Sequence, residues 1–193
     1  MAAEAMPRRA WTVAEVEAMV KAGILSEDER FEMIGGEVVP MSPKGARHEW
    51  VKVVLNRSLQ RTIGDEFVIA QETTLRLDER SFLEPDFCLF PALVLPGPVR
   101  GPDVLLAIEV ADSSLLYDTG RKISIYAAYG IPEVWVVNAK TLETLMFRTL
   151  GVEGYRTRRV FGPNDQLMAG SVDLSVTLAA LGLTPAEGRD EED

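Results

Sequence analysis

Cysteine and histidine are almost absent from this chain, which has one of each among its 193 residues. A single cysteine excludes a disulfide within the chain, and because Cys88 lies in the apolar run 87–90 we expect it to be a small core residue. A lone histidine without further nitrogen or sulfur ligands excludes the common kinds of zinc site. We therefore interpret His48 as a residue of a first helical turn with no role in chemistry, and we expect the reducing cytoplasm as the setting.

Long apolar runs are absent as well. No uncharged stretch reaches the roughly 18 residues that a membrane-spanning helix needs, and residues 1–9 contain no apolar segment of signal-peptide length. We expect neither a membrane partner nor export. The hydrophobic share of 47% is, in contrast, sufficient for one domain with a full core.

Basic residues are fewer than acidic ones, 20 against 30, and the formal net charge is −10. Such a charge argues against a nucleic-acid partner, because attraction to phosphate needs positive surface. The acid is unevenly placed, however, since residues 187–193 hold five acids and one arginine, which predicts a disordered tail. Between residues 44 and 61 the only acid is Glu49, and we predict a nucleic-acid-binding surface formed by Lys52, Arg57 and Arg61.

Apolar periodicity and turn residues predict one α/β domain whose mixed sheet is flanked by helices. The sequence has no internal repeat, so we predict an N-terminal extension at 1–10, a single domain at 11–183 and an acidic tail at 184–193. Helices are predicted at 13–22, 47–61, 117–129 and, briefly, 176–181. Strands are predicted at 67–77, 87–90, 104–110, 133–138, 145–148 and 155–161, with a hairpin at 30–41 around Gly35 and Gly36.

The strand predicted at 104–110 contains one acidic residue, Glu109, in an otherwise apolar run. Apolar residues on both alternating faces are typical of a central strand that is covered on both sides. An ionised carboxylate there is strongly unfavourable unless it is neutralised, hydrogen-bonded or bound to a cation. Glu109 is therefore a candidate site residue.

A second acid, Asp86, comes directly before the apolar strand 87–90 and after Pro85. If this strand and the strand 104–110 pair as an antiparallel hairpin about Gly97 and Pro98, residues 86 and 109 are equally far from the midpoint and meet. Paired carboxylates repel each other, and hard oxygen ligands of this kind suit Mg²⁺ or Mn²⁺. The spacing predicts a metal site formed by Asp86 and Glu109.

Lys122 lies on the helix predicted after this strand. It shares a helical face with Ile125, Tyr126 and Tyr129, at i, i+3, i+4 and i+7, so we expect its ammonium to be directed toward the sheet. Beside carboxylates and a metal ion, a lysine can orient or deprotonate the nucleophile and stabilise charge that develops on phosphate. Lys122 is the third candidate.

Several motifs, in order along the chain, resemble one known family. They are Glu84-Pro-Asp86-Phe, Ala-Ile-Glu109-Val-Ala-Asp-Ser-Ser114, Tyr-Asp-Thr-Gly-Arg-Lys122 and Tyr-Gly-Ile-Pro-Glu-Val-Trp135-Val-Val-Asn138, with Arg30-Phe-Glu32, Gly36-Glu-Val, Met41-Ser-Pro and His48 upstream. Together they are similar to the restriction-endonuclease-like family, a branch of the PD-(D/E)XK nuclease superfamily. The resemblance implies that fold and a Mg²⁺- or Mn²⁺-dependent nuclease that hydrolyses phosphodiester bonds, with DNA as the expected partner.

One position departs from the superfamily pattern. The lysine expected two residues after the acid is absent, since residue 111 is alanine. In the resembled family this lysine is placed on the following helix, which is where Lys122 stands. The resemblance also implies that Glu32 is an additional catalytic acid beside Asp86, Glu109 and Lys122.

Each candidate has a purely structural alternative. Asp86 can be a turn residue after proline, and Glu109 can form a buried structural pair with Lys122. Lys122 can instead form an exposed pair with Asp118, and Glu32 can face solvent from its hairpin.

Together these structural alternatives favour a different function for the chain, that of a non-catalytic nucleic-acid-binding or regulatory module that keeps the nuclease fold. Hydrolysis of some other phosphate ester is a third possibility. If both strands of a duplex are cut, we expect a homodimer, because that reaction needs two sites.

Overall fold

The computed structural model describes residues 9–26, 28–112 and 114–186, so most of the predicted N-terminal extension and acidic tail lies outside the described residues. The helices are α1 (Val13–Lys21), α2 (Ala46–Thr62), α3 (Leu115–Thr119) and α4 (Arg121–Ala128). The strands are β1 (Phe31–Ile34), β2 (Glu37–Pro40), β3 (Phe67–Gln71), β4 (Leu75–Asp78), β5 (Ser81–Leu83), β6 (Phe87–Pro91), β7 (Leu106–Ala111), β8 (Glu133–Asn138), β9 (Thr144–Gly151), β10 (Gly154–Phe161), β11 (Leu167–Met168) and β12 (Ser175–Val176). Short 3₁₀ turns occupy Ala92–Val94, Gly101–Asp103 and Ala179–Leu181.

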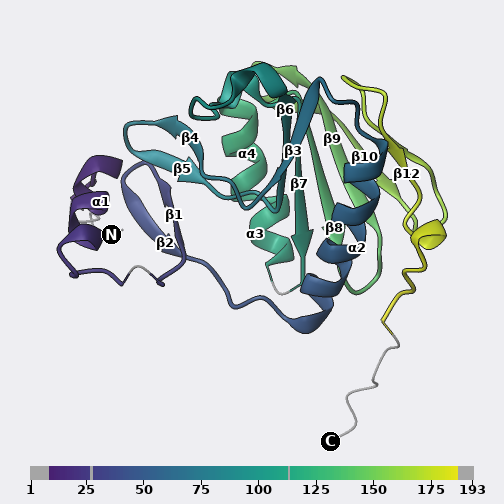
Figure 1. The fold of residues 1–193 in the computed structure, drawn as a ribbon, viewed down its shortest axis with the longest axis horizontal. Helices are drawn as coiled ribbons and strands as arrows, with labels where there is room; N and C mark the ends of the chain where they lie inside the picture. Colours follow the sequence, from purple (N-terminus) through teal and green to yellow (C-terminus); the bar gives the residue numbers. More distant parts are fainter. Residues whose placement is uncertain (1–8, 27, 113, 187–193) are drawn as a thin grey trace, which may run out of the picture.

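A six-stranded sheet forms the centre of the molecule (Figure 1), with strand order β10-β9-β8-β7-β6-β3. β7 and β8 are parallel and the other neighbours are antiparallel, so the sheet is mixed, as predicted. β6 and β7 pair Phe87 with Ile108. This is the predicted hairpin register, and one step further it sets Asp86 opposite Glu109.

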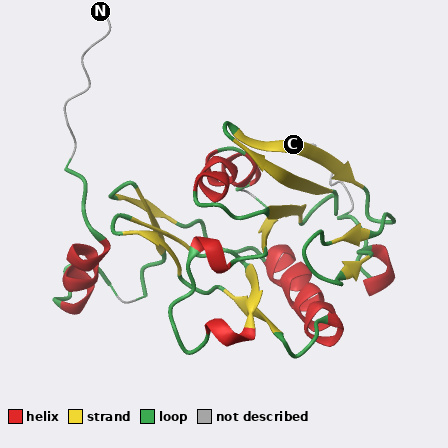
Figure 2. Ribbon diagram, turned by 90° about the horizontal axis from the view of Figure 1, so that it is seen from above, coloured by secondary structure: helices red, strands yellow, loops and turns green. Residues whose placement is uncertain are grey.

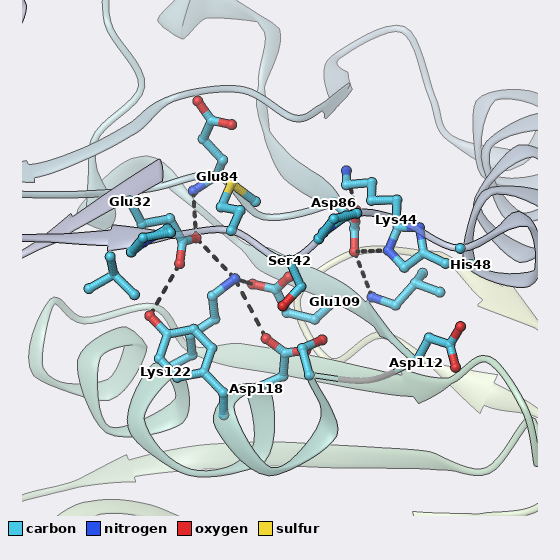
Figure 3. A pocket seen from close by; sticks show the side chains of 18 residues that line it. Glu32, Ser42, Lys44, His48, Glu84, Asp86, Glu109, Asp112, Asp118 and Lys122 are labelled. Atoms are coloured by element: carbon cyan, nitrogen blue, oxygen red, sulfur yellow. Dashed lines mark hydrogen bonds and ion pairs between the residues drawn. The ribbon is translucent and has the colours of Figure 1, made fainter. Parts of the chain in front are cut away.

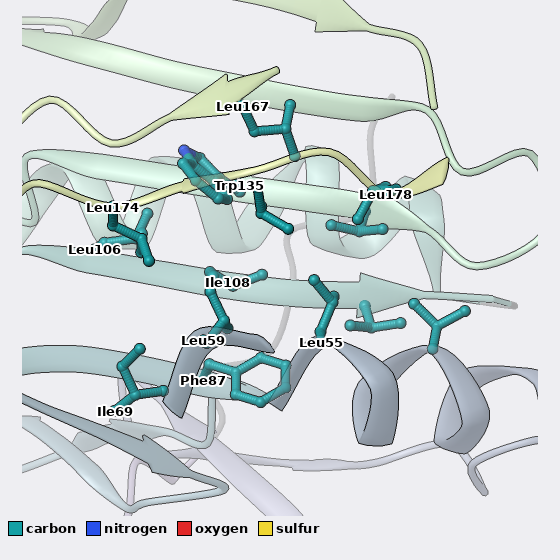
Figure 4. Packing of buried hydrophobic residues seen from close by; sticks show 14 of the residues in the cluster. Leu55, Leu59, Ile69, Phe87, Leu106, Ile108, Trp135, Leu167, Leu174 and Leu178 are labelled. Carbon is teal, nitrogen blue, oxygen red and sulfur yellow. The ribbon is translucent and has the colours of Figure 1, made fainter. Parts of the chain in front are cut away.

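Helices cover both faces of this sheet. α2 packs on one face together with the segment around β11 and β12, and α3 and α4 lie on the other (Figures 1 and 2). Alternate strand residues fill the two cores, since Phe87 and Leu89 face α2 while Cys88 and Phe90 belong to the core on the α4 side. Figure 4 shows the α2-side core, which includes Leu55, Leu59, Ile69, Leu106, Ile108, Trp135, Leu167, Leu174 and Leu178.

A second sheet of four short strands, in the order β2-β1-β5-β4, extends the molecule toward α1 (Figure 1). β1 and β2 form the predicted hairpin, and Gly35 and Gly36 in its turn both have positive φ. A Cβ on Gly36 would come within 2.8 Å of Ala10 and Trp11, so both the backbone conformation and the available space require glycine there. This hairpin places β1, which contains Glu32, beside the end of the main sheet where Asp86 lies.

Three predicted elements differ from the structure. The strand predicted at 67–77 is two strands in different sheets, β3 and β4, because Glu72 has a left-handed backbone with φ 49°, where a strand cannot continue. The helix predicted at 117–129 is α3 and α4, separated at Gly120 with φ −110° and ψ −94°. The helix predicted at 176–181 is only a 3₁₀ turn, since residues 175–176 form β12. Apolar spacing continues across such breaks, so periodicity does not detect them.

Within the described residues, no helix combines the length and the apolar character that crossing a bilayer requires.

Candidate active site

Asp86 and Glu109 lie at neighbouring strands and line the same pocket, of about 320 Å³ (Figure 3). Asp86 precedes β6 directly, and Glu109 is in the second half of β7. Along β7, Glu109 alternates into the same face as Ala107 and Ala111, which belong to the core on the α4 side. The register therefore brings both carboxyl groups to one pocket beside α3 and α4.

Asp86 is 5% exposed, and both of its carboxylate oxygens have partners. Lys44 Nζ lies 3.1 Å from Oδ1, while His48 Nε2 at 3.2 Å and the Val110 N–H at 2.8 Å approach Oδ2. Burial alone would raise the pKa of Asp86, but these three partners outweigh it and lower the pKa to about 2. Asp86 is thus an ionised carboxylate at neutral pH.

Lys122 lies at the start of α4, and its ammonium is buried among three carboxylates. Its Nζ is 3.0 Å from Glu32 Oε1, 3.1 Å from Glu109 Oε1 and 3.6 Å from Asp118 Oδ1. Burial by itself lowers the pKa of Lys122, but the three acids outweigh it and raise the pKa above its ordinary value. Lys122 stays protonated in this arrangement, so it cannot act as a general base here.

Glu109 is a buried acid whose pKa is raised by its surroundings. Burial raises the pKa of its carboxyl, Lys122 lowers it, and the charges of Asp118, Asp86 and Glu32 raise it again, to about 8. The Tyr126 hydroxyl donates a hydrogen bond to the same oxygen, Oε1, that accepts from Lys122. Burial and the neighbouring acids thus favour the protonated form of this carboxyl, and a cation beside it would favour the ionised form.

Glu32 lies on β1 and is 1% exposed, which excludes the solvent-facing alternative. Its Oε1 accepts hydrogen bonds from Lys122 and from the Glu84 N–H at 3.1 Å. The Tyr117 hydroxyl donates to Oε2 at 3.3 Å. The structure therefore brings Glu32 together with Glu109 and Lys122, as the resemblance implied.

Sequence reasoning missed the roles of Lys44 and His48 beside Asp86, and those of Tyr117 and Tyr126 beside Glu32 and Glu109. His48 is 6% exposed and joins Asp86 to Glu49, whose Oε1 lies 3.1 Å from His48 Nδ1. Burial lowers the pKa of His48, but the hydrogen bonds to Asp86 and Glu49 raise it above its ordinary value. A signal was available, because His48 precedes Leu55 and Leu59 of the buried α2 face at i, i+7 and i+11.

The structure corrects the position expected for Lys52. This residue is 6% exposed and faces inward, where its ammonium pairs with Glu49 at 3.0 Å and with Glu72. Arg57 and Arg61 are exposed on α2. Of the three residues predicted to form the basic surface, only Arg57 and Arg61 are therefore open to a phosphate.

The fit of a metal ion depends on the donor set. Among residues 9–26, 28–112 and 114–186, no three or more His, Cys, Asp or Glu side chains are arranged to hold a metal. The donor chemistry does fit, since Asp86 and Glu109 offer hard carboxylate oxygens, and Mg²⁺ is usually bound by one or two carboxylates with water and phosphate. The pocket also has excess acid, because two lysines, Lys44 and Lys122, face six acids: Glu32, Glu84, Asp86, Glu109, Asp112 and Asp118.

Comparisons with known proteins bear on the family and the fold of the chain. No match is found among curated proteins. Among solved structures, the chain is similar to one described as a putative nuclease belonging to DUF820 from Anabaena variabilis, with 14% identity and a TM-score of 0.59, over 83% of this chain and 96% of that chain. At that identity the likeness shows the fold. The model of the Uma2 family, described as "Putative restriction endonuclease", matches residues 13–180, and the chain therefore belongs to this family.

Proposed function

We propose that this chain is a metal-dependent nuclease that hydrolyses phosphodiester bonds, with DNA as its substrate. The observation that carries the proposal is the meeting of Asp86 and Glu109, through the β6–β7 register, in a pocket that also contains the buried Lys122. Membership of a family described as restriction endonucleases supports the same activity.

Asp86 and Glu109 are the residues that would hold Mg²⁺ or Mn²⁺. Such a cation, when bound, lowers the pKa of water and offsets negative charge on a phosphate. Asp86 is already ionised, and the Val110 N–H and His48 fix the orientation of its carboxylate. Tyr126 and Lys122 fix Glu109 in the same way, so the two ligands are preorganised by groups that are themselves buried.

Lys122 contributes positive charge. Because it stays protonated, it orients Glu109 and stabilises charge that develops on a phosphate oxygen in the pocket. Glu32 and Asp118 also pair with the ammonium and hold it in place. Their role is to position Lys122.

The second candidate function is a non-catalytic nucleic-acid-binding or regulatory module that keeps the fold. The observation in its favour is that Lys122 already has three carboxylate partners, which makes a complete buried ion network without any added cation.

The test compares Asp86→Asn and Glu109→Gln with a matched control, Asp112→Asn. Asp112 lines the same pocket and pairs with Lys140, so the control removes one carboxylate of the same wall. Mn²⁺ binding is measured by calorimetry, folding by thermal melts, and activity by cleavage of supercoiled plasmid in Mg²⁺. We expect the first two variants to lose Mn²⁺ binding and to cut ~10²-fold more slowly or worse. Glu109→Gln should stay folded, because glutamine resembles the protonated Glu109 that the raised pKa favours.

Three outcomes would contradict the proposal. If the wild-type protein binds no Mn²⁺, or if Asp112→Asn is as damaging as the other two variants, Asp86 and Glu109 are not the metal ligands. If Mn²⁺ binds at Asp86 but neither plasmid nor RNA is cut, the non-catalytic module is favoured.

A further inference from the structure

Six side chains beside the pocket form a closed ring in which acids and bases alternate. From Asp86 the ring passes through Lys44, Glu72, Lys52, Glu49 and His48 and returns to Asp86. Figure 3 shows the part of this ring at Asp86, where Lys44 and His48 approach the carboxylate from different elements. The ring is separate from the acids around Lys122, so Asp86 and Glu109 are each held by a network of their own.

Lys44 lies where the ring meets the pocket. It is on the loop between β2 and α2, its side chain is 15% exposed, and it lines both the Asp86 pocket and the neighbouring pocket that contains Lys52 and Glu72. Its ammonium is 3.1 Å from Asp86 Oδ1. A divalent cation that takes this oxygen would repel the ammonium beside it, so the two cations compete for Asp86 Oδ1.

Glu72 is the other partner of Lys44. Its carboxylate oxygen Oε1 accepts hydrogen bonds from both Lys44 and Lys52. Its backbone is left-handed, with φ 49°, which is uncommon for a residue other than glycine, and its N–H donates to the Asp86 carbonyl at 3.3 Å. A backbone outlier kept next to a site points to a role for the side chain that it directs.

We propose that Lys44 and Glu72 are positioning residues of this site. In the metal-free protein the Lys44 ammonium neutralises Asp86 as an internal cation. When a divalent cation binds Asp86 instead, Glu72 holds the displaced Lys44 ammonium. This rests on the proposed function, since it takes Asp86 as a metal ligand. Its consequence is that Lys44 weakens metal binding, while Glu72 strengthens it by giving the displaced ammonium a partner.

The ring also makes the test practicable, because each member has at least two partners, and Glu72 has a third in Arg30 at 3.6 Å. Removing the Lys44 charge leaves Glu72 with Lys52, and Asp86 with His48. Removing the Glu72 charge leaves Lys44 with Asp86, and Lys52 with Glu49. Neither change strands a buried charge, so both variants should fold.

The experiment measures Mn²⁺ affinity by calorimetry for the full chain and for Lys44→Gln, Glu72→Gln and the double variant, with thermal melts as a check on folding. We expect Lys44→Gln to bind Mn²⁺ roughly tenfold more tightly, and Glu72→Gln to bind it several-fold more weakly. The double variant should match Lys44→Gln, because Glu72 acts only through Lys44. Lys140→Gln is the matched control: it removes the same charge from a lysine that lies outside the pocket lining and pairs with Asp112, and it should change the affinity little.

The double variant separates this proposal from a general effect of charge. If the two substitutions act only through the electrostatic field, their effects add and the double variant returns toward the wild-type affinity. That result, or an unchanged affinity in Lys44→Gln, would overturn the inference. If Asp86→Asn abolishes Mn²⁺ binding in the same series, the proposed function survives that failure.

The remaining outcomes are also decisive. Binding of Mn²⁺ by Lys44→Gln but not by the wild-type chain would support Lys44 as the competing cation and would overturn metal dependence of the native protein. Absence of binding in both would overturn both proposals.

Discussion

At the scale of single residues, Lys122 has both a structural role in the buried ion network and a proposed role in the chemistry of the site. It is 4% exposed and holds Glu32, Glu109 and Asp118 together. Replacing it by methionine keeps the aliphatic stem but leaves the three acids without their cation. We expect a loss of ~3–5 kcal/mol in the free energy of unfolding, the range for breaking a buried pair from one side. Urea unfolding at pH 7 measures this, with Lys21→Met at the exposed end of α1 as the control.

The same variant has a second readout. Removal of the ammonium favours protonation of Glu109 and Asp118, whose pKa values burial already raises, so the loss of stability should shrink as the pH falls. Mn²⁺ should restore part of the stability if it binds the folded state at Asp86 and Glu109. A Lys122→Met protein as stable as wild type at pH 7 would show that the network contributes little to the fold.

At the scale of elements, α2 divides into two halves with different roles. Its first turns direct His48 and Lys52 inward to the ionic ring, and its later turns expose Arg57 and Arg61. The helix thus connects the pocket to the open basic surface. An acidic protein can offer a local phosphate-binding surface of this kind, although its net charge of −10 opposes approach at long range.

The prediction for α2 concerns the salt dependence of DNA binding. The variant with Arg57→Ala and Arg61→Ala should bind a duplex oligonucleotide more weakly, and the slope of log K against log salt should fall by about two units, roughly one for each phosphate contact. Lys52→Ala should leave this slope unchanged, because its ammonium is buried and paired. Fluorescence anisotropy in EDTA tests this without cleavage. An unchanged slope in the double variant would place the DNA on another surface.

At the scale of the whole molecule, the site depends on the complete fold. Glu32 lies on β1 of the small sheet and Glu109 on β7 of the main sheet. Asp86 directly precedes β6 of the main sheet, and Lys122 lies on α4 (Figure 3). The two sheets and the helix must be docked before the four groups meet. The chain has one Asp86–Glu109 pair, so under the proposed function one molecule would cut one strand.

A homodimer therefore stays a prediction tied to cleavage of duplex DNA. We expect nicked plasmid to accumulate first, and linear plasmid to form at a rate that rises faster than in proportion to protein concentration. Sedimentation measured over the same concentrations should show the dimer. Linear product without a nicked intermediate, from a protein that sediments as a monomer, would contradict this expectation.

The sequence by itself determined the parts of the site that local geometry controls. The meeting of Asp86 with Glu109 follows from a hairpin between consecutive strands, whose symmetry fixes which residues face each other. The inward direction of Lys122 follows from helical spacing. The structure has this direction although the predicted helix is broken at Gly120, because Lys122 and Tyr126 both lie after the break, on α4.

Only the tertiary structure decided what surrounds those groups. Lys44 and Glu72 are 28 residues apart, and Lys44 and Asp86 are 42 apart, so no local period relates them. The inward direction of the Lys52 side chain is likewise evident only in the folded protein, where Lys52 pairs with Glu72 of a distant loop. In the sequence, a lysine between apolar helix positions could equally well point into solvent. Ion pairs form wherever packing brings opposite charges together, and packing, unlike hydrogen-bond register, is set by the whole chain.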